Sequence, residues 1–117
     1  MQPQRLITRA PQSVRDCLKS LAKNPDYDGL RVMQTLIFER FMKEKPYKSR
    51  AFLWRQPAKV GIPGWKPFNV VLDEGLANRL RDESHKLDVS LQTYLLTGLI
   101  WWIAQKDPSF KLDPYEV

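Results

Sequence analysis

Residues 66–105 read KPFNVVLDEGLANRLRDESHKLDVSLQTYLLTGLIWWIAQ, and this stretch decides the fold. Residues 68–72 alternate between two faces with the period of a half-buried strand. Asp73 or Glu74 then begins an amphipathic helix, and Ser90 is placed to cap a second, strongly apolar helix. A lone strand cannot pair with itself, and two helices alone cannot bury the second of them. The stretch therefore predicts a partner, either a second copy or another part of this chain.

Residues 1–46 contain a second, weaker version of the same pattern. Alternation over 6–10 precedes helical spacing over 13–23, and both lie 62 residues before their counterparts. The offset predicts that each half is the partner the other needs, as in an internal pseudo-dimer. In the alternative interpretation, 1–10 is a flexible basic arm and the chain forms a homodimer. The expected helix limits in this half are a cap at Ser13 and a stop at Pro46.

The connector between the halves has a different composition. From Pro46 to Pro67 it holds four prolines, several aromatic and basic residues, and no acidic residue. We interpret it as irregular, with a short strand at 51–55, and its aromatic residues are expected to cover the core or to stack on nucleic-acid bases. The expected division is a helical pair at 1–46, a basic aromatic connector at 47–66, a strand-helix-helix unit at 67–107 and a tail at 108–117. The tail is expected either to fray or to dock through Phe110, Leu112 and Tyr115.

Charge is unevenly distributed along the 117 residues. Residues 1–66 hold fourteen Lys/Arg against five Asp/Glu, a net +9, whereas 67–117 have a net −3. A basic half favours contact with a polyanion, most often nucleic acid. One cysteine, Cys17, fits a reducing compartment, so we expect a cytoplasmic protein. The longest apolar run, residues 94–104, is too short to span a bilayer, so we expect no membrane segment. The single histidine, His85, lies among charged residues, and the sequence predicts no catalytic residues, no metal site and no cofactor.

The strand at 68–72, followed by Leu76, Leu80 and the helix opened by Ser90, resembles the ribbon-helix-helix DNA-binding family. The resemblance covers residues 66–105. It implies that two antiparallel strands enter the major groove, where outward side chains read base edges, and that the second helix binds a phosphate through free N–H groups. The outward strand positions implied are Pro67, Asn69 and Val71 with Lys66 beside them, and Arg5, Ile7 and Arg9 from the first half.

Among these positions, the resemblance implies base contacts from Arg5, Arg9 and Asn69. The implied phosphate contacts are Lys48, Arg50, Arg55, Lys59, Lys66, Ser90 and Leu91. The sequence departs from the family in one respect. Of the outward residues in the second half only Asn69 can hydrogen-bond a base well, whereas family ribbons more often show several polar or basic residues.

A second resemblance covers residues 13–42. The helix at 13–23, followed by Leu36, Glu39 and Arg40, resembles the N-terminal helices of AbiEii-type abortive-infection nucleotidyltransferase toxins. The catalytic part of that family has a Gly-Ser motif followed by paired acidic residues that hold a metal. Nothing in this chain matches that motif, so no transferase activity is expected.

The sequence thus predicts a mainly α fold with a short β-ribbon, either two ribbon-helix-helix units in one chain or one unit that dimerises. We expect non-catalytic binding to double-stranded DNA, as a repressor, antitoxin-like regulator or accessory factor of a plasmid or other mobile element. The alternative is a protein-interaction or dimerisation module that keeps the fold without reading DNA. A third interpretation is a fragmentary relative of a nucleotidyltransferase toxin.

Overall fold

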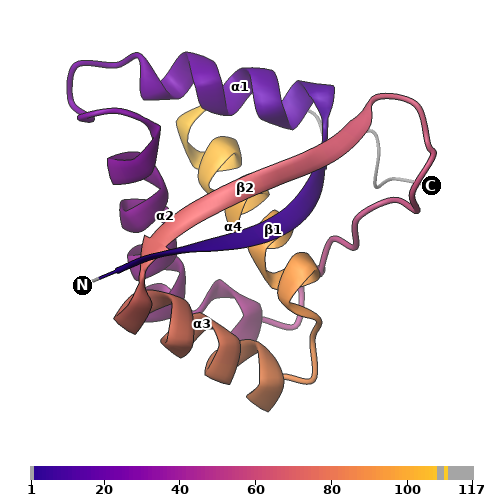
Figure 1. Ribbon diagram of the computed structural model, residues 1–117. Helices are drawn as coiled ribbons and strands as arrows, with labels where there is room; N and C mark the ends of the chain where they lie inside the picture. Colours follow the sequence, from indigo (N-terminus) through magenta and orange to yellow (C-terminus); the bar gives the residue numbers. More distant parts are fainter. Residues whose placement is uncertain (1, 108–109, 111–117) are drawn as a thin grey trace.

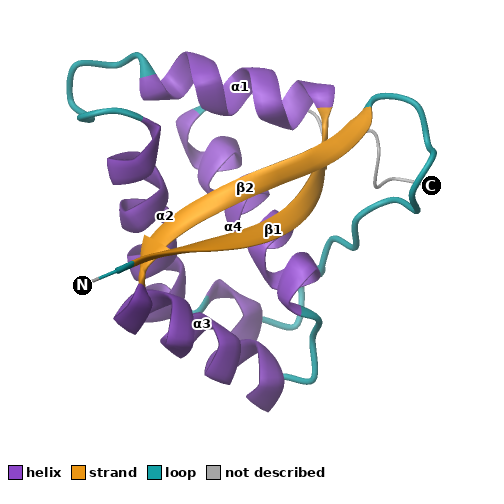
Figure 2. Ribbon diagram, in the orientation of Figure 1, coloured by secondary structure: helices purple, strands orange, loops and turns teal. Residues whose placement is uncertain are grey.

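The computed structural model describes residues 2–107 and 110, and within them the order strand-helix-helix occurs twice (Figures 1 and 2). The first set is β1 (Pro3–Pro11), α1 (Gln12–Ala22) and α2 (Leu30–Glu44). The second is β2 (Trp65–Asp73), α3 (Glu74–Lys86) and α4 (Leu91–Lys106). A short 3-10 helix, η1 (Pro46–Lys48), begins the connector between them. The architecture is a two-stranded antiparallel sheet with four helices in the described part of the chain.

The two strands come from the same chain and pair over their full lengths. Pro3 lies opposite Asp73, Pro11 lies opposite Trp65, and Ile7 faces Asn69 at the centre. Ile7 and Asn69 are also separated by the 62-residue offset between the two halves. Corresponding residues of the two strands are therefore related by an approximate two-fold axis through this central pair. The strand at the N-terminus shows that the flexible-arm interpretation of residues 1–10 is wrong.

One face of the ribbon is buried by the helices. The inward residues are all closed to solvent: Leu6, Thr8 and Ala10 on β1, and Phe68, Val70 and Leu72 on β2. An isolated two-stranded hairpin is marginal in water, so the helices behind the ribbon are what make it stable. In Figure 1 the ribbon crosses the front of the molecule, α4 runs behind it, and α1 and α3 flank it.

The halves interlock instead of lying side by side. Helix α4 of the second half packs on β1, and α2 of the first half packs on β2. Helix α4 is buried on nearly all sides, including Tyr94, Trp102 and Ile103, as expected for a central helix. Gly98 lets α2 approach closely, because a Cβ there would lie 2.6 Å from the ring of Phe38. Burying the apolar second helix therefore requires elements of both halves.

Helix ends agree with the sequence in the second half more than in the first. The Ser90 hydroxyl accepts from the Thr93 N–H at 3.1 Å, as predicted. Of the two residues expected to start α3, Asp73 is the cap, and its carboxylate accepts from the Leu76 N–H at 2.9 Å. The cap predicted at Ser13 is wrong. The cap position is Pro11 and helix α1 begins at Gln12, two residues earlier than a cap at Ser13 implies; the fixed φ of Pro11 is already suited to a helix entry, and Pro11 offers no side-chain cap.

The connector also differs from its predicted form. No strand forms at 51–55, because this segment lies along α4 and away from the free edges of the sheet. There the Arg55 N–H donates to the Thr97 hydroxyl at 2.8 Å, so a side chain takes the place of a neighbouring strand. Helix α2 ends at Glu44, and Lys45 adopts a left-handed conformation with φ 49° before Pro46 opens η1.

In the tail only Phe110 is described, and it packs partly buried against the core. The predicted docking of Leu112 and Tyr115 falls outside the described residues. Among those that are described, no helix is long and apolar enough to cross a bilayer.

Candidate nucleic-acid interface

The outer face of the ribbon is open to solvent and carries the residues predicted to read bases. Arg5, Ile7 and Arg9 project from β1, and across the ribbon they face Val71, Asn69 and Pro67 in that order. Arg5 and Asn69 are exposed, and Ile7 keeps 49% of its surface in solvent although it is a large apolar residue. The structure thus brings the three predicted base-contacting residues, Arg5, Arg9 and Asn69, onto one surface. We call the outward residues of the two strands the ribbon face.

The two arginines of the ribbon face are in different states. Arg9 is half-buried, and its Nη2 donates to the Trp65 carbonyl of the opposite strand at 3.3 Å. Its Nε is buried and has no hydrogen-bond partner among the described residues. Arg5 is exposed, and within the described part of the chain its guanidinium makes no hydrogen bond or ion pair. Arg5 is therefore the arginine with all its donors available to a ligand.

A buried glutamine holds the free edge of β2. Gln34, on α2, is only 1% exposed. Its Nε2 donates to the Asn69 carbonyl at 3.1 Å, and its Oε1 accepts from the Val71 N–H at the same distance. This paired contact uses two backbone groups that an edge strand would otherwise leave unpaired. It fixes the position of β2 at the centre of the ribbon face. Sequence reasoning missed this role, because Gln34 is a polar residue within the helical pattern of α2 and no local pattern marks it as buried.

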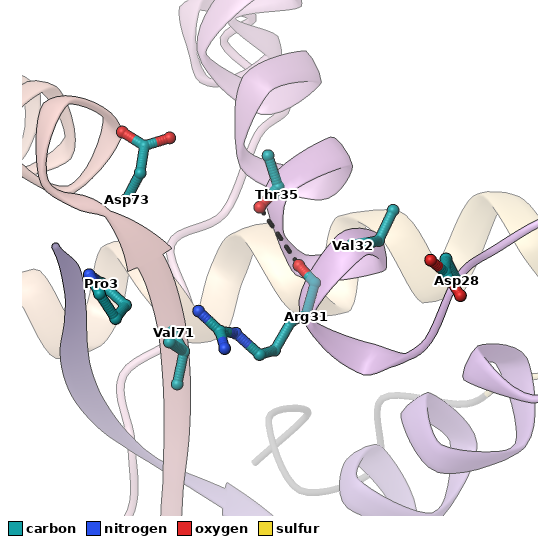
Figure 3. Close-up of a pocket in the computed structure, with 7 residues that line it drawn as sticks. All are labelled: Pro3, Asp28, Arg31, Val32, Thr35, Val71 and Asp73. Carbon is teal, nitrogen blue, oxygen red and sulfur yellow. Dashed lines mark hydrogen bonds between the residues drawn. The ribbon is translucent and has the colours of Figure 1, made fainter. Parts of the chain in front are cut away.

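The start of α2 lies beside the edge of the ribbon. A cavity of about 440 Å³ separates them, and its lining comes from the two strands, from α2 and from the turn before it. Figure 3 shows Arg31 extending from α2 toward Val71 of β2, with Asp28 on the other side of the helix start. Sequence reasoning missed Arg31. The available signal was its place one residue after Leu30, which opens the second helix of its half as Leu91 does in the other.

The corresponding start of α4 is partly enclosed. Ser90 is exposed and Leu91 is half-buried, and the cavity beside them, of about 500 Å³, has a wall formed by the connector. That wall consists of Trp54, Gln56 and Pro57. Ser90, one of the two residues that the resemblance assigned to a phosphate, therefore lines a space shared with the connector, whereas no connector residue lines the cavity at the start of α2.

The basic residues of the connector are outside the two strands that form the ribbon face. Lys48, Arg50 and Lys59 are exposed and Arg55 is half-buried. The connector that carries them runs from the end of α2 to the start of β2 (Figure 1). Lys66 is exposed at the end of the ribbon, opposite Ala10. Of the cations predicted to contact phosphates, only Lys66 belongs to the ribbon itself, and the others lie in the connector.

The aromatic residues of the connector pack inward. The rings of Tyr47 and Trp54 stack at 5.4 Å, and Trp54 also approaches Tyr94 of α4 at 5.9 Å. Phe41 of α2 lies 5.3 Å from Tyr47 and 6.2 Å from Phe52. Of the two predicted roles for these aromatics, covering the core is the one these contacts support. The connector is held against α2 and α4 by its rings, and its cations remain at the surface.

A small polar cluster ties the connector to α3. The Glu83 carboxylate accepts from the Tyr47 hydroxyl at 2.6 Å and from the Lys45 Nζ at 2.9 Å. The Tyr47 hydrogen bond and the Lys45 ammonium together lower the pKa of Glu83. Burial and the bond to Glu83 raise the pKa of Tyr47 to about 12. Burial also raises the pKa of Tyr94, which lies beside Tyr47. These shifts belong to a structural cluster on the side away from the ribbon face.

Searches of protein-family models, curated proteins and solved structures found no match to this chain.

Proposed function

We propose that the protein binds double-stranded DNA by inserting the ribbon into the major groove, as a single-chain ribbon-helix-helix pseudo-dimer. The observation that carries this proposal is the ribbon face itself. It is an exposed two-stranded surface with Arg5, Arg9 and Asn69 directed away from the core. The major groove admits a two-stranded β-ribbon, and Arg and Asn are the usual readers of guanine and adenine there.

The distribution of charge supports the same orientation on DNA. The net +9 of residues 1–66 includes both ribbon arginines, the connector cations and Lys66 at the end of β2. With the ribbon in the groove, Lys66 at the start of β2 and Arg31 beside the edge of β2 would be the cations nearest to the phosphate backbones. Phosphates further along the DNA would be contacted by the connector cations Lys48, Arg50, Arg55 and Lys59. Ser90 and Leu91, at the start of α4, would bind a phosphate through their backbone N–H groups. Such contacts position a protein without carrying sequence information.

The biological setting of the proposal rests on the family resemblance. It is that of a cytoplasmic transcriptional regulator or accessory factor of a plasmid or mobile element, acting without catalysis. Because the ribbon is complete within one chain, we propose that one chain occupies each DNA site.

The test is a titration of the full chain into labelled duplex DNA from upstream of its own gene, beside a scrambled duplex, at two salt concentrations. We expect the native duplex to be preferred by about 10³-fold or more, with affinity that falls steeply as salt rises. Arg5→Ala should reduce that preference, whereas Arg79→Ala, which removes the same charge from the exposed face of α3, should leave it unchanged. Equal, weak binding to both duplexes would overturn the proposal.

One observation favours a second candidate function, protein interaction through the connector. Leu53 is 62% exposed, Val60 is 83% exposed and Ile62 is 47% exposed, so three exposed apolar side chains occur within ten residues of a segment without regular structure. Exposed apolar residues that lie close together are a feature of protein-binding surfaces. If the DNA titration fails, an interaction that is lost in Leu53→Ser with Val60→Ser, and kept in Arg5→Ala, would support this candidate.

A further inference from the structure

The two strands of the ribbon are related by position but not by chemistry. The axis through the central pair relates Arg5 to Pro67, Ile7 to Asn69, and Arg9 to Val71. On the ribbon face, β1 therefore presents Arg, Ile and Arg, and β2 presents Pro, Asn and Val. A ribbon formed by two identical chains would show the same residues on both sides. Here every outward residue has an unlike counterpart.

We propose that this ribbon reads a non-palindromic DNA sequence. In that sequence Arg5 contacts a guanine on one side of the axis, and Asn69 contacts an adenine at the centre. The proposal rests on the proposed DNA binding. A two-fold symmetric protein surface matches an inverted repeat, because each half reads the same bases on opposite strands. An asymmetric surface gains nothing from the repeat.

The chemistry of each position sets the expected contacts. Arg5 has all its donors available and can bind the O6 and N7 of guanine through two hydrogen bonds. Asn69 can pair in the same way with the N6 and N7 of adenine, and the exposed Ile7 beside it suits a thymine methyl group. Arg5 is two residues from the central pair, about 7 Å along the strand, which corresponds to roughly two base-pair steps. The guanine and the adenine should therefore lie about two base pairs apart.

The other side of the axis has little to read with. Pro67 has no donor, and Arg9 already donates to the Trp65 carbonyl, so its remaining donors suit a single contact more than a paired one. At the base pairs on that side we expect a weaker sequence preference, which comes from one polar contact or from contacts with thymine methyl groups.

The helix starts that flank the ribbon differ in the same sense. The cavity at the start of α2 is lined by the strands, by α2 and by the turn before it, with Arg31 directed toward the ribbon. The cavity at the start of α4 has the connector residues Trp54, Gln56 and Pro57 in its wall. We therefore expect the contacts to the DNA phosphate backbone to differ between the two flanks. This difference adds to the asymmetry of the base contacts.

The experiment is selection of binding sites from a random duplex library by the purified full chain. Enrichment of a motif without an inverted repeat, with a guanine and an adenine about two base pairs apart, is the expected result. Enrichment of an inverted repeat would overturn the asymmetry and leave DNA binding intact. No enrichment of any sequence would overturn both the asymmetry and the proposed function.

Two variants connect the motif to the residues. Arg5→Ala should lower discrimination at the guanine by about 5- to 150-fold and leave the adenine preference, with Arg79→Ala as the matched control. The triple variant Pro67→Arg, Asn69→Ile and Val71→Arg gives both strands the same outward residues, and it should select an inverted repeat. Its urea denaturation is measured beside the parent chain, so that a loss of folding is recognised. A folded triple variant that selects the parental motif would overturn the assignment of readers.

Discussion

Replacing Gln34 by leucine should destabilise the protein far more than an ordinary polar substitution on a helix. The side chain is buried, and its amide group both donates to the Asn69 carbonyl and accepts from the Val71 N–H. Each backbone group left without its partner costs about 1–3 kcal/mol, a figure that already includes the lost hydrogen bond, so the middle of the range gives about 3–5 kcal/mol for the two groups together. Added apolar burial by leucine offsets about 1 kcal/mol of this loss. We therefore expect Gln34→Leu to lower the free energy of unfolding by about 2–4 kcal/mol.

Urea denaturation followed by circular dichroism measures this difference. With a slope typical of a small domain, the midpoint should fall by roughly 1–2 M. Gln92→Leu is the matched control, because Gln92 is exposed on α4 and its side chain makes no hydrogen bond among the described residues. The control should stay within about 0.5 kcal/mol of the parent chain. A loss below about 1 kcal/mol in Gln34→Leu would show that the edge of β2 does not depend on this side chain.

The same position provides a test by pH. In Gln34→Glu the protonated carboxyl can keep both contacts, whereas the carboxylate cannot donate to the Asn69 carbonyl and would be buried with its charge. Burial raises the pKa of the introduced carboxyl above its unfolded value of about 4.3. The stability of this variant should therefore approach that of the parent chain below about pH 4 and fall as pH rises through the folded pKa. Parallel pH profiles for the variant and the parent chain would refute the assigned contacts.

Three further outcomes test the packing and the polar cluster. Gly98→Val should cost about 2–4 kcal/mol in urea denaturation, because even its Cβ meets the Phe38 ring, whereas Ala104→Val on the exposed face of α4 should cost little. Because the pKa of Glu83 is lowered in the fold, its contribution to stability is present above about pH 4.3 and is lost as pH falls through the folded pKa. Glu83→Gln should therefore make stability less dependent on pH on the acid side. An unchanged acid dependence would count against the cluster. Because the pKa of Tyr47 is raised to about 12, its contribution to stability is present below about pH 10 and is lost between about pH 10 and about 12. Tyr47→Phe should therefore reduce the alkaline loss of stability, measured by tyrosine absorbance and circular dichroism, and the part due to the raised pKa of Tyr94 should remain.

The ribbon was predictable because the alternation of buried and exposed residues along a strand is a local and periodic pattern. Alternation at 6–10 and 68–72 identified the buried faces of both strands, and it assigned Arg5 and Asn69 correctly to the outside. The 62-residue offset related the two strands correctly, but it did not predict which pair of corresponding residues lies at the centre of the pairing, because every such pair has the same offset. The caps at Asp73 and Ser90 were predictable for the same reason, because a capping side chain acts within a single turn of helix.

The rest of the interface depends on contacts between distant parts of the chain. No local pattern indicates that the amide of Gln34 reaches the edge of β2, because that contact exists only after α2 has packed on the second half. The path of the connector is similar. Its composition allowed both an exposed aromatic surface and a cover for the core, and only the positions of Phe41 and Tyr94 decide between them. Arg31 was missed because its position beside the ribbon is set by tertiary packing.

The interlocked arrangement of the halves has a consequence for synthesis on the ribosome. Strand β1 is made before β2, and at the centre of the ribbon Asn69 follows its partner Ile7 by 62 residues. At a translation rate of about 5–20 residues per second, β1 waits roughly 3–12 seconds for β2. Helix α4, which packs on β1, is made later still. During this delay neither the edge nor the apolar face of β1 is covered by its partners. The nascent chain is therefore most prone to associate with other chains before α4 emerges.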